Sequence, residues 1–113
     1  MTAADVLALL LVIQAVWYAI TGLWPLLSYP TFARVTGDKH DRWLVRMVAA
    51  LALAASLAVS RAGDDPLIPL AFATAFVCGD ALALRAGFPR WYLADLVVEL
   101  GFAATVITCA LLR

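Results

Sequence analysis

Four long and almost wholly apolar segments constrain the fold of this chain more than any other feature. They cover residues 4–29, 43–60, 67–84 and 91–112 of the 113 residues. At a rise of about 1.5 Å per residue, a helix of about 18 to 22 residues spans about 27–33 Å, close to a bilayer core of about 30 Å. We therefore expect one transmembrane domain over residues 1–113, all-α, with short loops and no soluble catalytic domain.

Composition points to the same surroundings. Hydrophobic residues make up 65% of the chain and charged residues 14%, against about 45–50% and about 25% in typical soluble domains. The lipid bilayer is therefore an expected partner. Lys and Arg together number eight, as do Asp and Glu, so no net field attracts nucleic acid, and a nucleic-acid partner is excluded. The first segment carries Asp5 where a secretory signal has basic residues, so it is read as a retained span.

Short connections between the four segments predict an up-down-up-down four-helix bundle. Small residues recur every four positions in the second segment, at Ala50, Ala54 and Ala58. Such a stripe lets helix backbones approach closely in lipid. It does not distinguish contacts within one bundle from contacts between copies. Because four short helices bury few side chains, a homodimer or a larger membrane complex is an expected assembly.

Basic residues predict the orientation of the chain in a bacterial cytoplasmic membrane. The first and third loops with their flanks hold six of them, and the other side holds only Arg61 and Arg113. By the positive-inside rule, loops one and three lie in the cytoplasm and both termini lie outside. Three of the six are expected to contact anionic lipid headgroups, namely Arg34, Lys39 and Arg42.

A set of polar residues inside the predicted spans is the most specific chemical feature. Counted along the helices, Arg46, Asp80 and Asp95 lie about 5–7 Å below the cytoplasmic boundary, and Glu99 about 12 Å below it. The first segment adds a stripe with helical spacing: Gln14, Trp17, Tyr18 and Thr21. These eight residues are the candidates for a ligand-binding or proton-linked site.

The cost of burying charge separates two interpretations of this set. An ionised side chain near a helix centre costs about 2.5–3.5 kcal/mol even on lenient insertion scales. We therefore expect the four ionisable residues to face inward, with Arg46 paired to Asp80 or Asp95 in a structural role. Glu99 then lacks an evident cation. It is expected to stay protonated or to lie beside a cationic ligand, which makes it the strongest functional candidate.

Other chemistry receives little support. His40 is the only histidine and lacks spaced partners, so no metal site is expected, and no motif indicates a cofactor. Cys78 and Cys109 are predicted at opposite membrane surfaces, too far apart for a disulfide. No residue is assigned a catalytic role from the sequence.

The segment around the first loop carries a resemblance to known proteins. Its motifs are Trp24-Pro25, Val35-Thr36-Gly37-Asp38-Lys39 and Asp41-Arg42-Trp43-Leu44-Val45-Arg46. This pattern resembles a family of small bacterial four-span membrane proteins with no known activity. In length and span count the chain is also similar to small multidrug resistance transporters. Those proteins use a glutamate in their first helix, whereas this chain has Gln14 there and Glu99 in its fourth.

Three functions remain open on this evidence. The first is a small binding or accessory membrane protein, whose inward polar cluster holds a lipid-like or small ligand or docks to a larger membrane complex. The second is a proton-coupled transporter of small solutes that acts as a dimer, with Glu99 as the carrier acid. The third is a membrane enzyme on a lipid-soluble substrate, with Glu99 and Asp95 as proton donor and acceptor.

Overall fold

The computed structural model describes residues 1–113 and contains only helices. They are α1 (Ala3–Leu27), α2 (Tyr29–Thr36), α3 (Arg42–Ser60), α4 (Leu67–Arg85) and α5 (Trp91–Leu112). Four of them, α1, α3, α4 and α5, are long and apolar enough to cross a membrane. The predicted four-helix membrane bundle is confirmed, and the protein is a multi-pass membrane protein.

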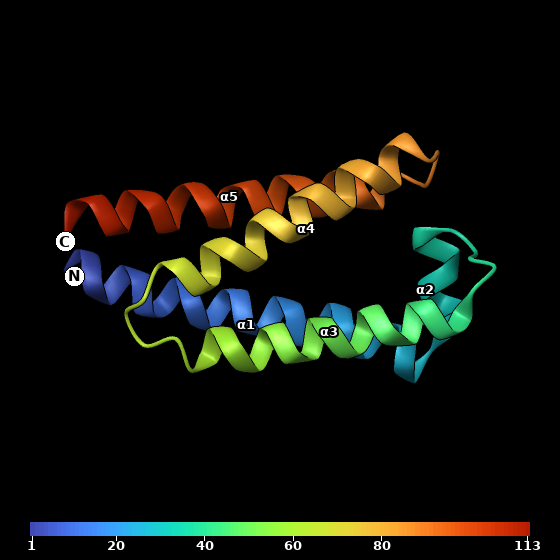
Figure 1. Cartoon of the computed structure of the whole chain (residues 1–113), viewed down its shortest axis with the longest axis horizontal. Coiled ribbons are helices and arrows are strands. Elements are labelled where there is room, and N and C mark those ends of the chain that lie inside the picture. The colour runs from blue at the N-terminus through green and yellow to red at the C-terminus, as the bar shows by residue number, and fades with distance from the viewer.

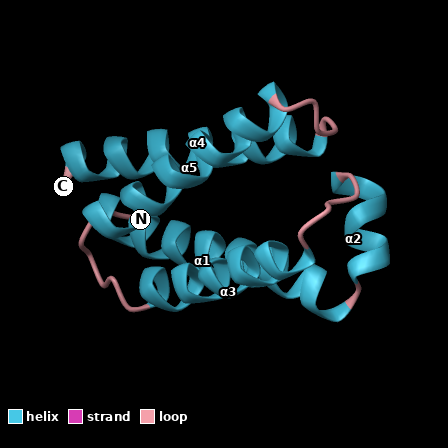
Figure 2. Ribbon diagram, turned by 45° about the vertical axis from the view of Figure 1, so that its right-hand side comes forward, coloured by secondary structure: helices cyan, strands magenta, loops and turns pink.

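The helices form two antiparallel pairs. α1 packs along α3, α4 packs along α5, and contacts between α1 and α5 join the pairs. Figures 1 and 2 show the pairs close together where both termini lie and spread apart at the opposite end, where α2 lies. We call these the terminal end and the α2 end. Since α3 and α4 make few contacts, the bundle is tightly packed only on one side.

The apolar core lies toward the terminal end. It consists of eight buried residues from α1, α3 and α5: Leu7, Leu11, Ala15, Tyr18, Ala55, Val59, Val106 and Cys109. Both cysteines are free, and Cys78 is exposed. Because the apolar side chains close this half of the bundle, space inside the protein is left mainly toward the α2 end.

Small residues set the distance between α1 and α3. A Cβ placed on Gly22 would lie 3.0 Å from the carbonyl oxygen of Ala49 and 3.1 Å from the Cβ of Ala52. The buried face of α3 contains Ala49, Ala52 and Ala55, each less than 5% exposed. The predicted stripe is therefore on the wrong face for packing within the bundle, because Ala50 and Ala54 are exposed.

The first loop contains α2, a helix that the sequence analysis did not predict. α1 runs through Pro25 and ends at Leu27, two residues before the predicted end of the span at residue 29. α2 starts at Tyr29 with a proline in its first turn, a position where the missing N–H costs nothing. It stops at Gly37, whose φ of 92° lies in the left-handed region that glycine adopts freely.

Candidate functional site

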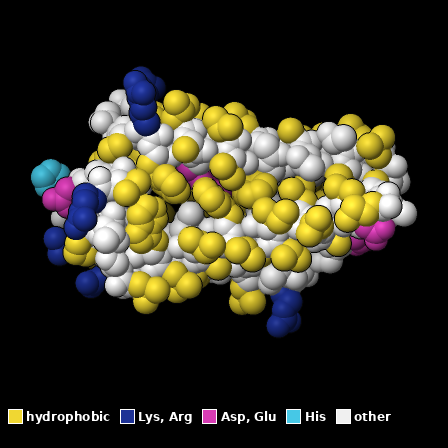
Figure 3. Space-filling model, turned by 180° about the vertical axis from the view of Figure 1, so that it is seen from behind, with side chains coloured by type: hydrophobic (Ala, Val, Ile, Leu, Met, Phe, Trp, Pro, Cys, Tyr) yellow, Lys and Arg dark blue, Asp and Glu magenta, His cyan; other side chains and the backbone are white.

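A cavity of about 530 Å³ lies between the two helix pairs at the α2 end. Its volume falls within the range of about 300–1,000 Å³ that is common for small-molecule sites. All five helices and the loop after α2 contribute to its lining. In the space-filling view of Figure 3, acidic atoms are visible at the bottom of a hollow in an otherwise apolar surface.

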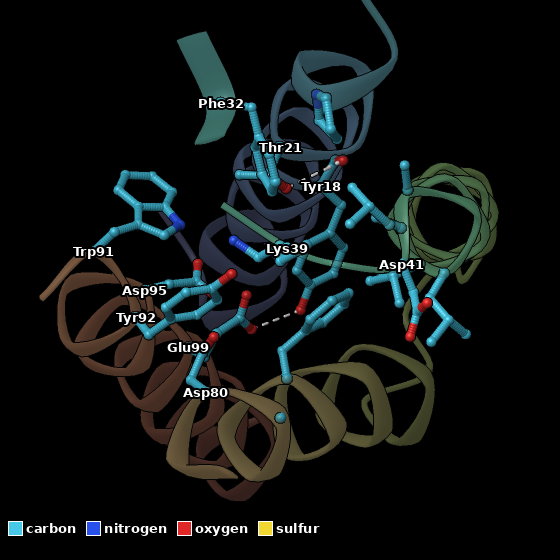
Figure 4. Close-up of a pocket in the computed structure, with 18 of the residues that line it drawn as sticks. Tyr18, Thr21, Phe32, Lys39, Asp41, Asp80, Trp91, Tyr92, Asp95 and Glu99 are labelled. Atoms are coloured by element: carbon cyan, nitrogen blue, oxygen red, sulfur yellow. Dashed lines mark hydrogen bonds between the residues drawn. The ribbon is translucent and has the colours of Figure 1, made fainter. Parts of the chain in front are cut away.

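The cavity is polar on one side and apolar on the other. Asp80 of α4 and Asp95 and Glu99 of α5 lie on the polar side, and we call these three residues the carboxyl cluster. Figure 4 looks into the cavity and shows the cluster on the side opposite α3. The α3 wall consists of Leu44, Val45, Val48, Ala49 and Ala52. A molecule in this space would meet carboxyl groups at one side and hydrocarbon at the other.

Glu99 is held by a chain of hydrogen bonds that crosses three helices. The Tyr18 hydroxyl of α1 donates to Glu99 Oε2 at 2.8 Å and accepts from Gln14 Nε2 at 2.9 Å. The same Gln14 nitrogen donates to the carbonyl oxygen of Pro69 in α4, also at 2.9 Å. That carbonyl can only accept, which fixes the orientation of the Gln14 amide. Gln14, Tyr18 and Glu99 are each no more than 1% exposed, so the predicted stripe and the predicted acid do converge.

Asp95 and Asp80 occupy the level nearer the α2 end. Trp17 Nε1 donates to Asp95 Oδ1 at 2.8 Å, and the Trp17 ring stacks on Trp91 with 6.0 Å between ring centroids. Asp80 and Asp95 both line the cavity. The Thr21 hydroxyl lines the cavity but donates to the Trp17 carbonyl oxygen of its own helix, at 2.9 Å.

No basic side chain pairs with the carboxyl cluster. The prediction that Arg46 faces inward and binds Asp80 or Asp95 is wrong, because Arg46 is exposed. The ion pair in the protein joins Arg113 to Asp64 at the terminal end, 3.4 Å apart. Counting residues gave Arg46 a suitable depth, but it lies about 100° around the helix from Val45, which faces the cavity.

Two buried oxygen atoms of the cluster have no hydrogen-bond partner, namely Asp80 Oδ2 and Glu99 Oε1. Asp80 is 5% exposed and Glu99 1%. Leaving a buried polar atom unsatisfied costs about 1–3 kcal/mol, and more if the group is charged. No three His, Cys, Asp or Glu side chains converge as ligands for a metal ion. The free acceptors therefore suit a ligand that donates hydrogen bonds.

Lys39 also lines the cavity, but its ammonium group is already engaged. Its Nζ donates to the Thr36 carbonyl oxygen at 2.9 Å, the Thr36 hydroxyl at 2.8 Å and the Gly37 carbonyl oxygen at 2.6 Å. Three aromatic rings surround it with centroids 4.9–5.3 Å away, those of Phe32, Phe88 and Tyr92. Burial lowers the pKa of Lys39 to about 8, and the charge of Asp38 opposes that shift.

The three basic residues predicted to contact lipid headgroups therefore differ in where the structure places them. Lys39 turns inward, which differs from the surface position that the sequence suggested. Arg42 lies over the Tyr29 ring, with its guanidinium carbon 4.4 Å from the ring centroid. Arg34 is exposed near the end of α2. For Arg34 and Arg42 a headgroup contact stays a prediction.

Several lining residues were not among the sequence candidates. Phe76 packs against the Tyr18 ring at 4.8 Å between centroids, and Trp91 and Tyr92 line the cavity from the start of α5. Gly79 leaves open space, since a Cβ there would meet no atom within 4 Å. The spacing of Phe76, Gly79 and Asp80 on one helix could have indicated Phe76 and Gly79, because residues three and four apart share a face.

No protein-family model, curated protein or solved structure matches the chain.

Proposed function

We propose that this protein is a small membrane binding protein that holds a small amphiphilic ligand in the cavity at the α2 end. The observation that carries the proposal is the pair of unpartnered oxygens, Asp80 Oδ2 and Glu99 Oε1, in a cavity of about 530 Å³. Buried polar groups are normally hydrogen-bonded. Three buried oxygens lack a partner, and the two that belong to residues lining the cavity are those of Asp80 and Glu99, whereas the third, Gln14 Oε1, lies on a residue outside its lining. A ligand with hydrogen-bond donors would remove this penalty on binding.

The difference in polarity between the two sides of the cavity determines how the ligand is oriented. Its polar group lies against the carboxyl cluster, and its apolar part lies along the α3 wall, for example against Val48 and Ala52. Apolar contact contributes roughly 25 cal/mol for each Å² removed from water, but a ligand that arrives from lipid gains little of this. The polar contacts therefore determine which molecules are selected.

The charge distribution supports an orientation in the membrane. The α2 end holds most of the basic residues, so by the positive-inside rule we place it toward the cytoplasm of a bacterial cell, with both termini outside. The exposed positions of Ala50 and Ala54 on α3 support a second copy as partner, because small residues permit close helix contact in lipid.

A matched pair of glycine variants tests the proposal. Gly79 lines the cavity and Gly101 of α5 does not, yet a Cβ at either position would meet no atom within 4 Å. Gly79→Trp should place an indole ring in the cavity, and Gly101→Trp should place one on the outer surface. Each protein is gently solubilised, and its retained small molecules are measured by native mass spectrometry.

We expect wild type and Gly101→Trp to carry the same bound molecule and Gly79→Trp to lose it. Bare protein in all three samples, or equal retention in all three, would contradict a ligand in this cavity. Bare wild type would indicate that water satisfies the two free oxygens.

A proton-coupled transporter that acts as a dimer is the second candidate. The unpaired Glu99 favours it, because one carboxyl can hold either a proton or a cation, and like-charged neighbours make simultaneous ionisation costly. In sealed liposomes, Glu99→Gln should abolish a flux driven by a pH gradient while leaving the helical content unchanged. A flux that persists in this variant would remove the carrier role of Glu99.

A further inference from the structure

We infer that the ligand is a protonated amine with an apolar body, that is, an ammonium carrying N–H groups on a hydrocarbon chain or ring. This inference rests on the proposed binding function and names its ligand class. Asp80 from α4 and Glu99 from α5 both line the cavity, and each carries one buried oxygen without a hydrogen-bond partner. A group with at least two N–H donors can satisfy both.

The acidic character of the carboxyl cluster favours a cationic ligand. The carboxyl cluster brings three acidic groups together without a basic partner. Removing one partner of a buried charge pair leaves the other charge uncompensated, which is costly in a low-dielectric site. An ammonium supplies the missing positive charge. A carboxylate or phosphate ligand would bring a further acidic group beside the carboxyl cluster and is disfavoured.

The protein's own cation does not take this place. Lys39 is the only lysine in the chain, and its three N–H groups are donated to the backbone and hydroxyl oxygens of Thr36 and Gly37. Arg46 points away from the cavity. The cationic position beside Glu99 is therefore open to a ligand.

Hydrogen-bond geometry distinguishes an amine from a quaternary ammonium. The cluster offers acceptors, and charge-assisted N–H···O bonds are roughly twice as strong as neutral ones. A trimethylammonium group carries the same charge but has no N–H to donate. Aromatic rings are the usual partners of quaternary ammonium groups, and two of the rings that line the cavity, Phe32 and Tyr92, lie around Lys39.

The experiment compares three amphiphiles that share one chain length: dodecylamine at neutral pH, dodecyltrimethylammonium and dodecanol. Binding to the full-length protein in nanodiscs is followed through the change in total tryptophan fluorescence, to which Trp91 in the cavity lining contributes, with empty nanodiscs to correct for partition into lipid. Dodecylamine should bind at least about tenfold more tightly than either of the others, the difference expected for one charge-assisted hydrogen bond.

Variants locate the selective contact. Asp80→Asn and Glu99→Gln should each reduce the preference for dodecylamine about tenfold or more. Asp64→Asn removes an exposed carboxylate at the terminal end and should leave it unchanged. Because the three-ligand comparison uses wild type alone, it holds even where a variant fails to fold.

The outcomes separate the two proposals. If dodecanol or dodecyltrimethylammonium binds wild type as tightly as dodecylamine, the amine inference is overturned and the binding function stands. If none of the three binds above the empty-nanodisc level, both the inference and the proposed function fail.

Discussion

Replacing Tyr18 with Phe tests the hydrogen-bond chain that holds the candidate site together. The substitution removes one oxygen atom and keeps the ring, which packs against Phe76 and Phe102 at 4.8 and 6.3 Å between centroids. Two hydrogen bonds are lost, the 2.9 Å bond from Gln14 and the 2.8 Å bond to Glu99. Inter-helix hydrogen bonds in membrane proteins contribute about 0.6 kcal/mol on average and up to about 1.7 kcal/mol. The expected loss of unfolding free energy is therefore about 1–3 kcal/mol.

The assay is reversible unfolding in mixed micelles of a mild detergent and sodium dodecyl sulfate, followed by tryptophan fluorescence. A double-mutant cycle with Glu99→Leu, whose side chain cannot accept a hydrogen bond, isolates the Tyr18–Glu99 bond from other effects of each change. We expect the second substitution to cost less after the first, with a coupling energy of about 0.6–1.7 kcal/mol. Tyr18→Phe indistinguishable from wild type, together with zero coupling, would refute the hydrogen-bond chain.

Three further predictions concern the fold and the loop after α2. Gly22→Ala should destabilise the protein by about 1–3 kcal/mol in the same assay, because its Cβ would press on the backbone of Ala49; unchanged stability would mean that α1 and α3 are not in close contact. Arg46→Gln should change stability by less than about 0.5 kcal/mol, as expected for a surface position, whereas a loss of several kcal/mol would restore the ion pair that the sequence suggested. Lys39, dimethylated with ¹³C and followed by NMR, should titrate near pH 8 instead of near 10.5. The pKa of Lys39 is lower in the folded protein than in the unfolded chain, so its contribution to stability is present above about pH 10.5 and is lost as the pH falls through about 8. A measured pKa near 10.5 would contradict the burial of Lys39.

The transmembrane helices could be predicted from the sequence because bilayer thickness ties span length to a long apolar run. The short helix α2 could not, since its eight residues carry no apolar period of useful length. Depth within the membrane was also predictable, and Gln14, Tyr18 and Glu99 lie at matching levels, joined by hydrogen bonds.

Rotation around each helix axis was harder to predict. On α3, alanines occur on more than one face, so the stripe at Ala50 and Ala54 was indistinguishable from the true contact at Ala49 and Ala52. Arg46 was assigned inward for its depth alone. The inward turn of Lys39 depends on the turn at Gly37 and on three rings brought together by the fold, and no local pattern predicts that.

One distance tests the central claim, that an ammonium group binds at the carboxyl cluster. Glu99 is the only glutamate in the chain, so glutamate labelled with ¹³C at its side-chain carboxyl carbon reports on that residue alone. In solid-state NMR of the protein in bilayers with ¹⁵N-labelled dodecylamine, the account predicts dipolar coupling for a nitrogen-to-carbon distance of roughly 3–4 Å, as a charge-assisted hydrogen bond requires. No coupling with the amine bound at saturation would place the ligand elsewhere and contradict the assignment of Glu99.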